Sequence, residues 1–219
     1  GMPLFDALCN SLSTLAAGGF SPNPQSTAGY HSNTINWIII VFMFFAGASF
    51  NLQYKVISQK NISLFFKNEE FKTYLFMVLL MSGLITLALV VNNNYSIFQG
   101  ITDALYQVVS ITTSTGSANT DFNNWDLTAK ILLFMVMFMG SCSSSAGGGI
   151  KMTRWLLVFK SMKSSLIRIL HPNAVVNIKI DNQIVQPEVI RQIIVFVFFY
   201  IMLFAVGAVL IALIEQNTT

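Results

Sequence analysis

The sequence predicts an all-α membrane protein made of repeated units, each with a helix, a re-entrant helix and a second helix. The composition is 54% hydrophobic and only 10% charged, whereas soluble domains are about a quarter charged. Four apolar segments are long enough to cross a hydrocarbon core of roughly 30 Å, which takes about 20 residues. Two shorter apolar segments each end in a stretch rich in Gly, Ser or Thr and precede a full span. We expect the units to form an incomplete set.

The four predicted spans cover residues 37–56, 73–91, 127–161 and 189–214. The shorter segments, 4–17 and 97–112, are too short to cross, so we expect each to enter the membrane as a helix and return as a strand. A signal-peptide core or an interfacial helix is the alternative for segment 4–17, and the second copy of the layout argues against it. Because no cleavable signal is visible and the chain opens almost directly into a half-span, we expect a piece of a longer protein.

The third span is interrupted by the sequence Gly140-Ser-Cys-Ser-Ser-Ser-Ala-Gly-Gly-Gly-Ile-Lys151. Irregular backbone at membrane depth survives only where it is buried in protein or lines a water-filled cavity, because hydrocarbon cannot satisfy free N–H and C=O groups. The break therefore indicates a pore. We interpret Lys151 first as a lysine that anchors the loop or extends toward the membrane surface, and second as a gate contact.

Charge placement predicts the orientation of the spans. Basic residues cluster between the first two spans and again between the last two, which makes both connections cytoplasmic by the positive-inside rule. Both short helices then enter from outside. The net charge of +3 belongs to these connections and favours anionic lipid head groups or an acidic partner surface, with no pattern that favours nucleic acid.

The two halves of the chain carry an internal repeat. Asp6, within Phe-Asp-Ala-Leu, corresponds to Asp103, within Thr-Asp-Ala-Leu, and each copy continues into a small or hydroxyl-rich stretch and then a span. Repeats that cannot close a structure alone are often arranged around an axis in membrane pores and transporters.

Potassium selection requires rings of backbone carbonyls that replace the hydration shell of the ion. Glycine reaches positive φ readily, so Gly18 and Gly116 are expected to turn carbonyls toward such a path. The short helices would direct the negative ends of their dipoles at a cation. Ser114 and Thr115 can add hydroxyls, while Ala16 and Ala17 offer carbonyls only. The alternative for the Thr-Ser-Thr-Gly sequence is an ordinary polar turn, and its position after a re-entrant helix argues against that.

Four motifs together resemble the Trk/Ktr/HKT superfamily of potassium uptake transporters, and most closely the pore subunit of the bacterial Trk-type branch. These motifs occupy residues 13–21, 108–116, 140–151 and 171–174. The resemblance implies that the chain is the central part of a pore of four repeats. The implied segments are 1–57 (pore helix, filter strand and second span of repeat two), 58–72 (cytoplasmic linker), 73–170 (repeat three with an intramembrane gate loop at 140–150), 171–187 (cytoplasmic hairpin linker) and 188–219 (first span of repeat four).

The resemblance also implies which residues contact the ion and which obstruct its path. The implied filter residues are Ala16, Ala17, Gly18, Ser114, Thr115 and Gly116. The implied gate residues are Ser141, Ser143, Ser144, Ser145, Gly147, Gly148, Gly149 and Lys151. Trk members commonly carry a hydroxyl residue where this chain has Ala17, which puts hydroxyl-based tuning of affinity in doubt.

By the same resemblance, potassium is the transported substrate, with no covalent cofactor and no transition metal. The full-length subunit is expected to be a homodimer in the bacterial inner membrane, in contact with lipid, with its filter side outside and its basic linkers cytoplasmic. A cytoplasmic nucleotide-binding regulatory subunit is the implied partner, and a hairpin predicted at residues 175–185 is a candidate contact.

Other functions are less well supported by the sequence. A secondary transporter that holds a small anionic substrate at a half-helix N-terminus is the main alternative. A phosphate loop needs Gly-Lys-[Ser/Thr], whereas Ile150 here separates the last glycine from Lys151. An enzyme is not expected, because the two histidines, two cysteines and scattered carboxylates offer no catalytic or metal-ligand spacing.

Overall fold

The computed structural model describes residues 2–171 and 177–215, which form two compact units, Gly1–Thr153 and Arg154–Thr219. The first unit contains α1 (Leu4–Leu15), the 3-10 helix η1 (Ser26–Tyr30), α2 (Asn33–Gly47), α3 (Phe50–Gln59), α4 (Ser63–Lys67), α5 (Glu69–Asn92), α6 (Ile97–Thr112), the 3-10 helix η2 (Phe122–Asn124) and α7 (Leu127–Val136). The second contains most of α8 (Met152–Leu170), then β1 (Lys179–Ile180), β2 (Gln183–Ile184) and α9 (Pro187–Glu215).

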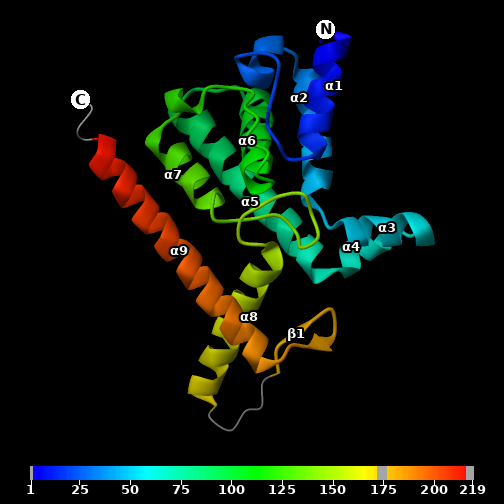
Figure 1. The fold of residues 1–219 in the computed structure, drawn as a ribbon, viewed down its shortest axis with the longest axis vertical. Coiled ribbons are helices and arrows are strands. Elements are labelled where there is room, and N and C mark those ends of the chain that lie inside the picture. The colour runs from blue at the N-terminus through cyan, green and yellow to red at the C-terminus, as the bar shows by residue number, and fades with distance from the viewer. Residues whose placement is uncertain (1, 172–176, 216–219) are drawn as a thin grey trace. The chain divides into compact units, whose positions relative to one another are not determined.

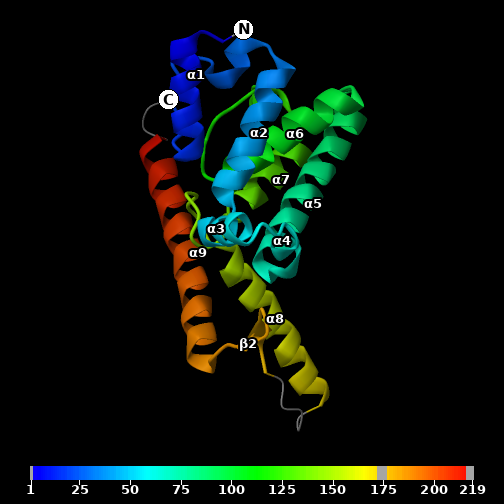
Figure 2. The same ribbon diagram turned by 90° about the vertical axis from the view of Figure 1, so that its right-hand side faces the viewer.

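Helix α6 lies at the centre of the first unit and packs against α2, α5 and α7 (Figures 1 and 2). Ala104, Val108 and Val109 are almost completely buried along it. On α5, the fully buried Tyr74 stacks on Phe44 of α2 with ring centroids 4.9 Å apart. These contacts hold α6, which is too short to cross a membrane, between the longer α5 and the helices α2 and α7.

Side-chain caps set where three of these helices begin. Asn68 accepts a hydrogen bond from Phe71 N–H at the start of α5, and Ser96 accepts one from Gln99 N–H at the start of α6. Asp126 does the same for Thr128 N–H at the start of α7. Burial raises the pKa of the Asp126 carboxyl, but hydrogen bonds from Asn92 and Thr128 outweigh this, so its pKa is lower than usual. Each cap satisfies a backbone donor that the helix leaves free.

Within the described residues, two helices are long and apolar enough to cross a membrane, α5 and α9, which confirms the spans expected at 73–91 and 189–214. The break expected within 127–161 is also present, because α7 ends at Val136 and the next helix starts at Met152. The span expected at 37–56 is not one continuous helix. Helix α2 ends at Gly47, and α3 continues at an angle of 98° to it.

This sharp bend is stabilised by partners for the last four carbonyls of α2, which a helix leaves free. The pairs are Phe44 O with the Tyr74 hydroxyl, Phe45 O with Gln53 Nε2, Ala46 O with Ala146 N–H, and Gly47 O with Cys142 N–H. Two of these donors come from the irregular segment after α7. Free carbonyls would not be tolerated at membrane depth, so the irregular segment and the bend stabilise each other.

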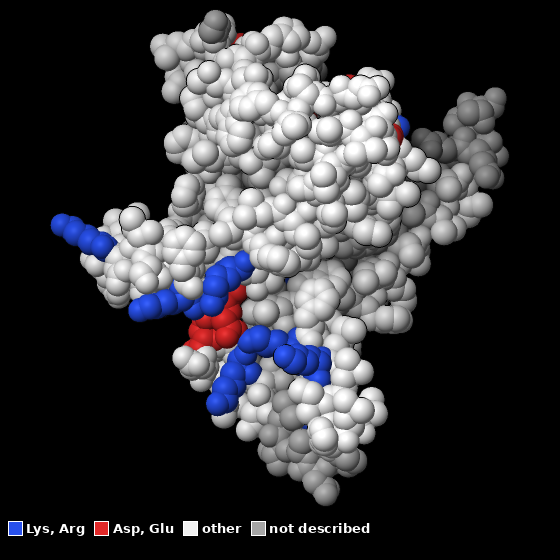
Figure 3. Space-filling view, turned by 180° about the vertical axis from the view of Figure 1, so that it is seen from behind, with Lys and Arg blue, Asp and Glu red and all other residues white. Residues whose placement is uncertain are grey.

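The surface of the first unit separates charge from apolar area. Figure 3 shows blue and red atoms gathered at α3, α4 and the first turn of α5, while the rest of its visible surface is almost entirely white. Phe76, Leu79 and Leu87 on α5 are exposed. An apolar band beside a charged rim is typical of a protein surrounded by lipid.

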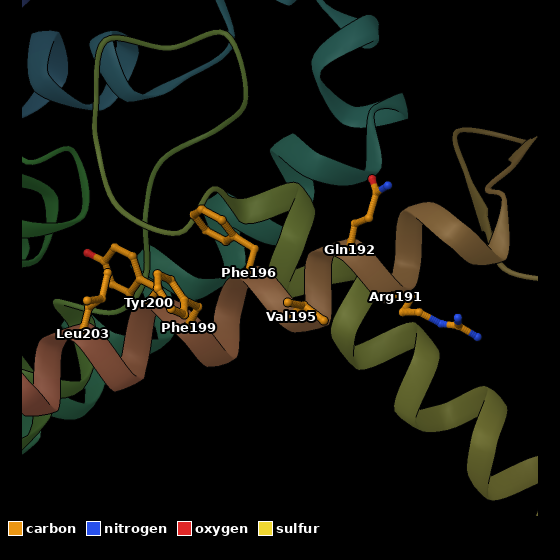
Figure 4. Close-up of a pocket in the computed structure, with 7 residues that line it drawn as sticks. All are labelled: Arg191, Gln192, Val195, Phe196, Phe199, Tyr200 and Leu203. Atoms are coloured by element: carbon orange, nitrogen blue, oxygen red, sulfur yellow. The ribbon is translucent and has the colours of Figure 1, made fainter.

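In the second unit, the Arg154 guanidinium of α8 lies over the ring of Phe196 of α9, 3.8 Å from its centroid. Strands β1 and β2 pair around Asp181 and Asn182. This confirms the expected hairpin within the described residues, and positions 175 and 176 lie outside them. Figure 4 shows the apolar groove along α9, with Phe199 and Tyr200 at one end and Arg191 at the other.

Candidate functional site

The segments that follow α1 and α6 have matching backbone conformations. Ala17 N–H donates to Thr14 O and Gly18 N–H to Ser13 O, as Ser114 N–H donates to Ile111 O and Thr115 N–H to Ser110 O. The φ angle is positive at Ala17 and Gly19 (54° and 71°), and likewise at Ser114 and Gly116 (58° and 74°). Both short helices therefore end in the same turn, which we call the repeat-two turn (residues 16–19) and the repeat-three turn (residues 113–116).

The expectation of a positive φ at Gly18 is wrong, because Ala17 and Gly19 have positive φ and Gly18 does not. Gly116 does have it. The spacing of the internal repeat contains the reason. Asp6 and Asp103 are 103 − 6 = 97 positions apart, and 116 − 97 = 19, so the equivalent of Gly116 is Gly19.

The two turns lie against each other. A Cβ placed on Gly19 would overlap the carbonyl oxygen of Thr115 and would lie 3.1 Å from the carbonyl carbon of Gly116. Only glycine allows the two backbones to approach this closely. All six expected filter residues therefore lie on these two adjoining turns, Ala16, Ala17 and Gly18 on one and Ser114, Thr115 and Gly116 on the other.

Buried hydroxyls hold the repeat-three turn in shape. The Thr113 and Thr115 hydroxyls are 2.8 Å apart, and Ser110 Oγ donates to Ser117 O at 2.6 Å. The Tyr106 hydroxyl lies 2.6 Å from both Ser117 Oγ and Thr27 Oγ1. Thr27 follows the repeat-two turn, so this network also connects the two repeats. The hydroxyl residues Ser114 and Thr115 could be predicted from the sequence, whereas Tyr106 could not, because no spacing pattern marks it.

The irregular segment between α7 and α8, called here the gate loop (residues 140–151), lies directly against the repeat-three turn. Gly148 N–H donates to Ser114 Oγ at 3.2 Å. A Cβ on Gly147 would lie 2.7 Å from Thr113 O, so glycine is required there as well. Ser144 is exposed and its carbonyl accepts from Phe50 N–H of α3, while Gly149 has a φ of 73°.

The Lys151 side chain folds back over the gate loop. Its Nζ donates to the Gly147 carbonyl and, at 3.2 Å, to Ser145 Oγ. Ser145 Oγ in turn lies 2.7 Å from Ser141 Oγ. Lys151 thus bonds to the loop itself, as both interpretations of this residue require.

The described part of the chain has no group of three or more His, Cys, Asp and Glu side chains that could hold a metal ion. Cys9 and Cys142 are free thiols. The polar groups of the two turns are backbone carbonyls and neutral hydroxyls.

The family described as "TrkH: Cation transport protein" matches residues 1–219. The chain belongs to this TrkH family. It is 35% identical to the Trk system potassium uptake protein TrkH of Salmonella typhimurium over 94% of its length, and 29% identical to TrkG of Escherichia coli over 91%. The crystal structure of the potassium transporter TrkH from Vibrio parahaemolyticus superposes with a TM-score of 0.88 at 33% identity and covers 94% of this chain.

The chain spans less than half the length of these TrkH-family relatives, 43% of the Salmonella protein and 45% of the Vibrio chain. The family and the helical membrane fold therefore agree with the resemblance seen in the sequence. The relatives named here are transport proteins, and their names give potassium as the ion that they take up.

Proposed function

We propose that this chain forms the central part of a potassium uptake pore, in which the repeat-two and repeat-three turns supply half of the ion filter. The observation that carries the proposal is the pair of matching turns at the C-terminal ends of α1 and α6, in contact through Gly19 and Thr115. Both helix dipoles direct their negative ends at this point, which stabilises a cation. The names of the relatives support potassium as the ion.

In this proposal the carbonyls of residues 16–19 and 113–116 replace the water around potassium. Ala16, Ala17, Gly18 and Gly19 contribute from one turn, and Ser114, Thr115 and Gly116 from the other. Because Thr115 is 2% exposed and its hydroxyl bonds to Thr113, the carbonyl and not the hydroxyl is the better ligand. The two remaining quarters of the ring would come from parts of the full-length protein that this chain does not include.

The gate loop is proposed to obstruct the path just inside the filter. Its support is the contact of Gly147 and Gly148 with the first residues of the repeat-three turn, together with Lys151 folded over the loop. Ser141, Ser143 and Ser145 hold the loop in this conformation through their hydroxyl and backbone hydrogen bonds.

The proposed setting is the bacterial inner membrane, with the filter outside and the lysine-rich α3–α4 connection in the cytoplasm. The proposed assembly is a homodimer of the full-length subunit, regulated by a cytoplasmic nucleotide-binding subunit. The hairpin β1–β2 exposes Asp181 and Asn182, so it is accessible to such a partner.

The function is tested by expressing the full-length protein in cells that lack potassium uptake. We expect growth at low external potassium and rubidium uptake that excess potassium inhibits more strongly than excess sodium. A protein that reaches the membrane but restores neither growth nor uptake would contradict the proposal, and transport of an anion instead would favour the broken-helix alternative.

Replacing Lys151 with methionine should increase uptake in the absence of the regulatory subunit. Hydrogen bonds to a charged group contribute about 1.5–3 kcal/mol, and the Gly147 carbonyl and Ser145 would lose this donor. We expect Lys151→Arg to retain most of the restraint. Rubidium uptake measures the effect, with Lys55→Met on α3 as a control for lost positive charge, and equal uptake in Lys151→Met and wild type would contradict the role.

A further inference from the structure

A buried carboxylate contacts both ends of the gate loop. Glu70, in the first turn of α5, is 9% exposed. Its Oε1 accepts hydrogen bonds from Ser143 N–H and from the Thr153 hydroxyl, each at 2.5 Å. Ser143 lies near the start of the loop and Thr153 just past its end, and their own hydroxyls are 2.7 Å apart. One oxygen atom of α5 thus joins the two ends of the loop.

The backbone at the neck of the loop makes further hydrogen bonds. Gly140 N–H donates to Ile150 O at 2.9 Å, and Met152 N–H donates to Ser141 O at 3.0 Å. These bonds hold the two ends of the loop beside each other. They do not fix where the loop lies against the helices, since both partners of each bond would move together. Backbone bonds from Cys142 and Ala146 join the loop to the end of α2, and Glu70 adds a carboxylate that joins the neck to α5, which packs against α6.

The charge of Glu70 suits this task. Hydrogen bonds to an ionised acceptor are roughly twice as strong as bonds between neutral groups, and they are strengthened further where water is excluded. Without the carboxylate, the Ser143 N–H and the Thr153 hydroxyl would both lose this acceptor. The structure therefore gives a single side chain control over two donors on opposite sides of the loop.

We propose that Glu70 is a positioning residue that holds the gate loop closed, and that the loop moves only when the carboxylate releases Ser143 and Thr153. This inference rests on the proposed function of the loop as a gate and adds the contact that restrains it. The contacts of Glu70 are with Ser143 and Thr153 and not with the repeat-two or repeat-three turn. It therefore controls how often the path is open and leaves the choice of ion unchanged.

The first test uses the full-length protein in cells without the regulatory subunit. We expect rubidium uptake to rise about threefold in Glu70→Gln, which keeps a neutral acceptor, and about tenfold in Glu70→Ala, which removes it. The preference for potassium over sodium should stay at the wild-type value in both. Thr73→Val is the matched control on α5, because the Thr73 hydroxyl donates only within its own helix, to Glu69 O at 2.8 Å.

A second measurement follows the opening of the gate loop directly, through the labelling rate of a cysteine in it, and does not depend on ion flux. Cys142 is 1% exposed beside Ser143, so its reaction with a maleimide reports opening in purified protein whose other cysteines are serine. We expect faster labelling in Glu70→Gln and in Thr153→Val, and a double variant that labels no faster than the faster single variant, because both act through one oxygen atom. Thr153→Val leaves the buried carboxylate in place, so it tests the contact even if the Glu70 variants do not fold.

Wild-type labelling and wild-type uptake in Glu70→Gln and Thr153→Val would overturn the inference. A changed ion preference in Glu70→Gln would also overturn it. Failure of the proposed function is distinguishable from this, because it would show as absence of potassium uptake in the wild-type protein, whatever the labelling of Cys142.

Discussion

Replacing Gly19 with alanine should abolish the preference for potassium over sodium in the full-length protein. The new Cβ would overlap the Thr115 carbonyl oxygen, and positive φ adds a cost of about 1–2 kcal/mol for a residue with a side chain. The two turns must then separate, and a carbonyl ring that has moved no longer matches the ion. Since each 1.4 kcal/mol is about a tenfold change in relative binding, we expect a loss of at least about tenfold.

Alanine substitutions at two neighbouring glycines, Gly18 and Gly116, serve as comparisons for this prediction. A Cβ on Gly18 would have only ordinary contacts, the nearest at 3.5 Å, and a Cβ on Gly116 would meet no atom within 4 Å although its φ is 74°. The expected order of damage is therefore Gly19, then Gly116, then Gly18, whose alanine variant should stay close to wild type. Rubidium uptake in competition with sodium measures the ion preference of each variant, and the amount of each variant in the membrane is the control. Equal damage at Gly18 and Gly19 would contradict the assignment.

Deleting Gly147–Gly149 should give the largest rise in uptake without the regulatory subunit. The deletion removes the part of the gate loop that contacts Thr113 and Ser114, together with the carbonyl that Lys151 binds. The shortened segment cannot reach the filter turn while its neck remains closed. We expect a large rise in uptake and only a small change in the preference for potassium over sodium, because the repeat-three turn keeps its own hydroxyl contacts.

A less drastic variant accompanies the deletion. A Cβ on Gly148 would lie 3.3 Å from Ser114 Oγ, so Gly148→Val pushes the loop tip away from the turn without shortening the chain. Gly83→Ala on α5 is the control, because no atom lies within 4 Å of the added carbon. Low uptake in both loop variants, despite normal insertion into the membrane, would mean that the loop is a structural break and not a gate.

Much of the fold could be predicted from the sequence because apolar length and glycine placement act locally. The re-entrant helix at 97–112 has the same bounds in the structure, and the broken third span follows from a run of small residues that lipid would not accept. The bend after Gly47 could not be predicted. It depends on donors from Cys142 and Ala146, which are distant in the sequence, and an apolar stretch looks the same whether or not such donors exist.

The candidate site shows the same division. The positive φ of Gly116 could be predicted from its position after a helix. The positive φ of Gly19 could not be told from one at Gly18 without the spacing of the repeat, because two adjacent glycines look equivalent. Glu70 was not predicted at all. Glutamates in the first turn of a helix are common, and α5 has two of them. Only the folded chain brings Glu70 to Ser143 and Thr153.

The bend between α2 and α3 has a consequence for the order in which the protein is made. Helix α2 leaves the ribosome well before Cys142 and Ala146, the donors that its last carbonyls need. Until those residues arrive, a sharp bend would leave bare carbonyls in lipid, so the newly made segment is better satisfied as one continuous helix. We therefore expect α2 and α3 to enter the membrane straight and to bend only when the gate loop docks, which makes this corner of the pore one of the last parts to mature.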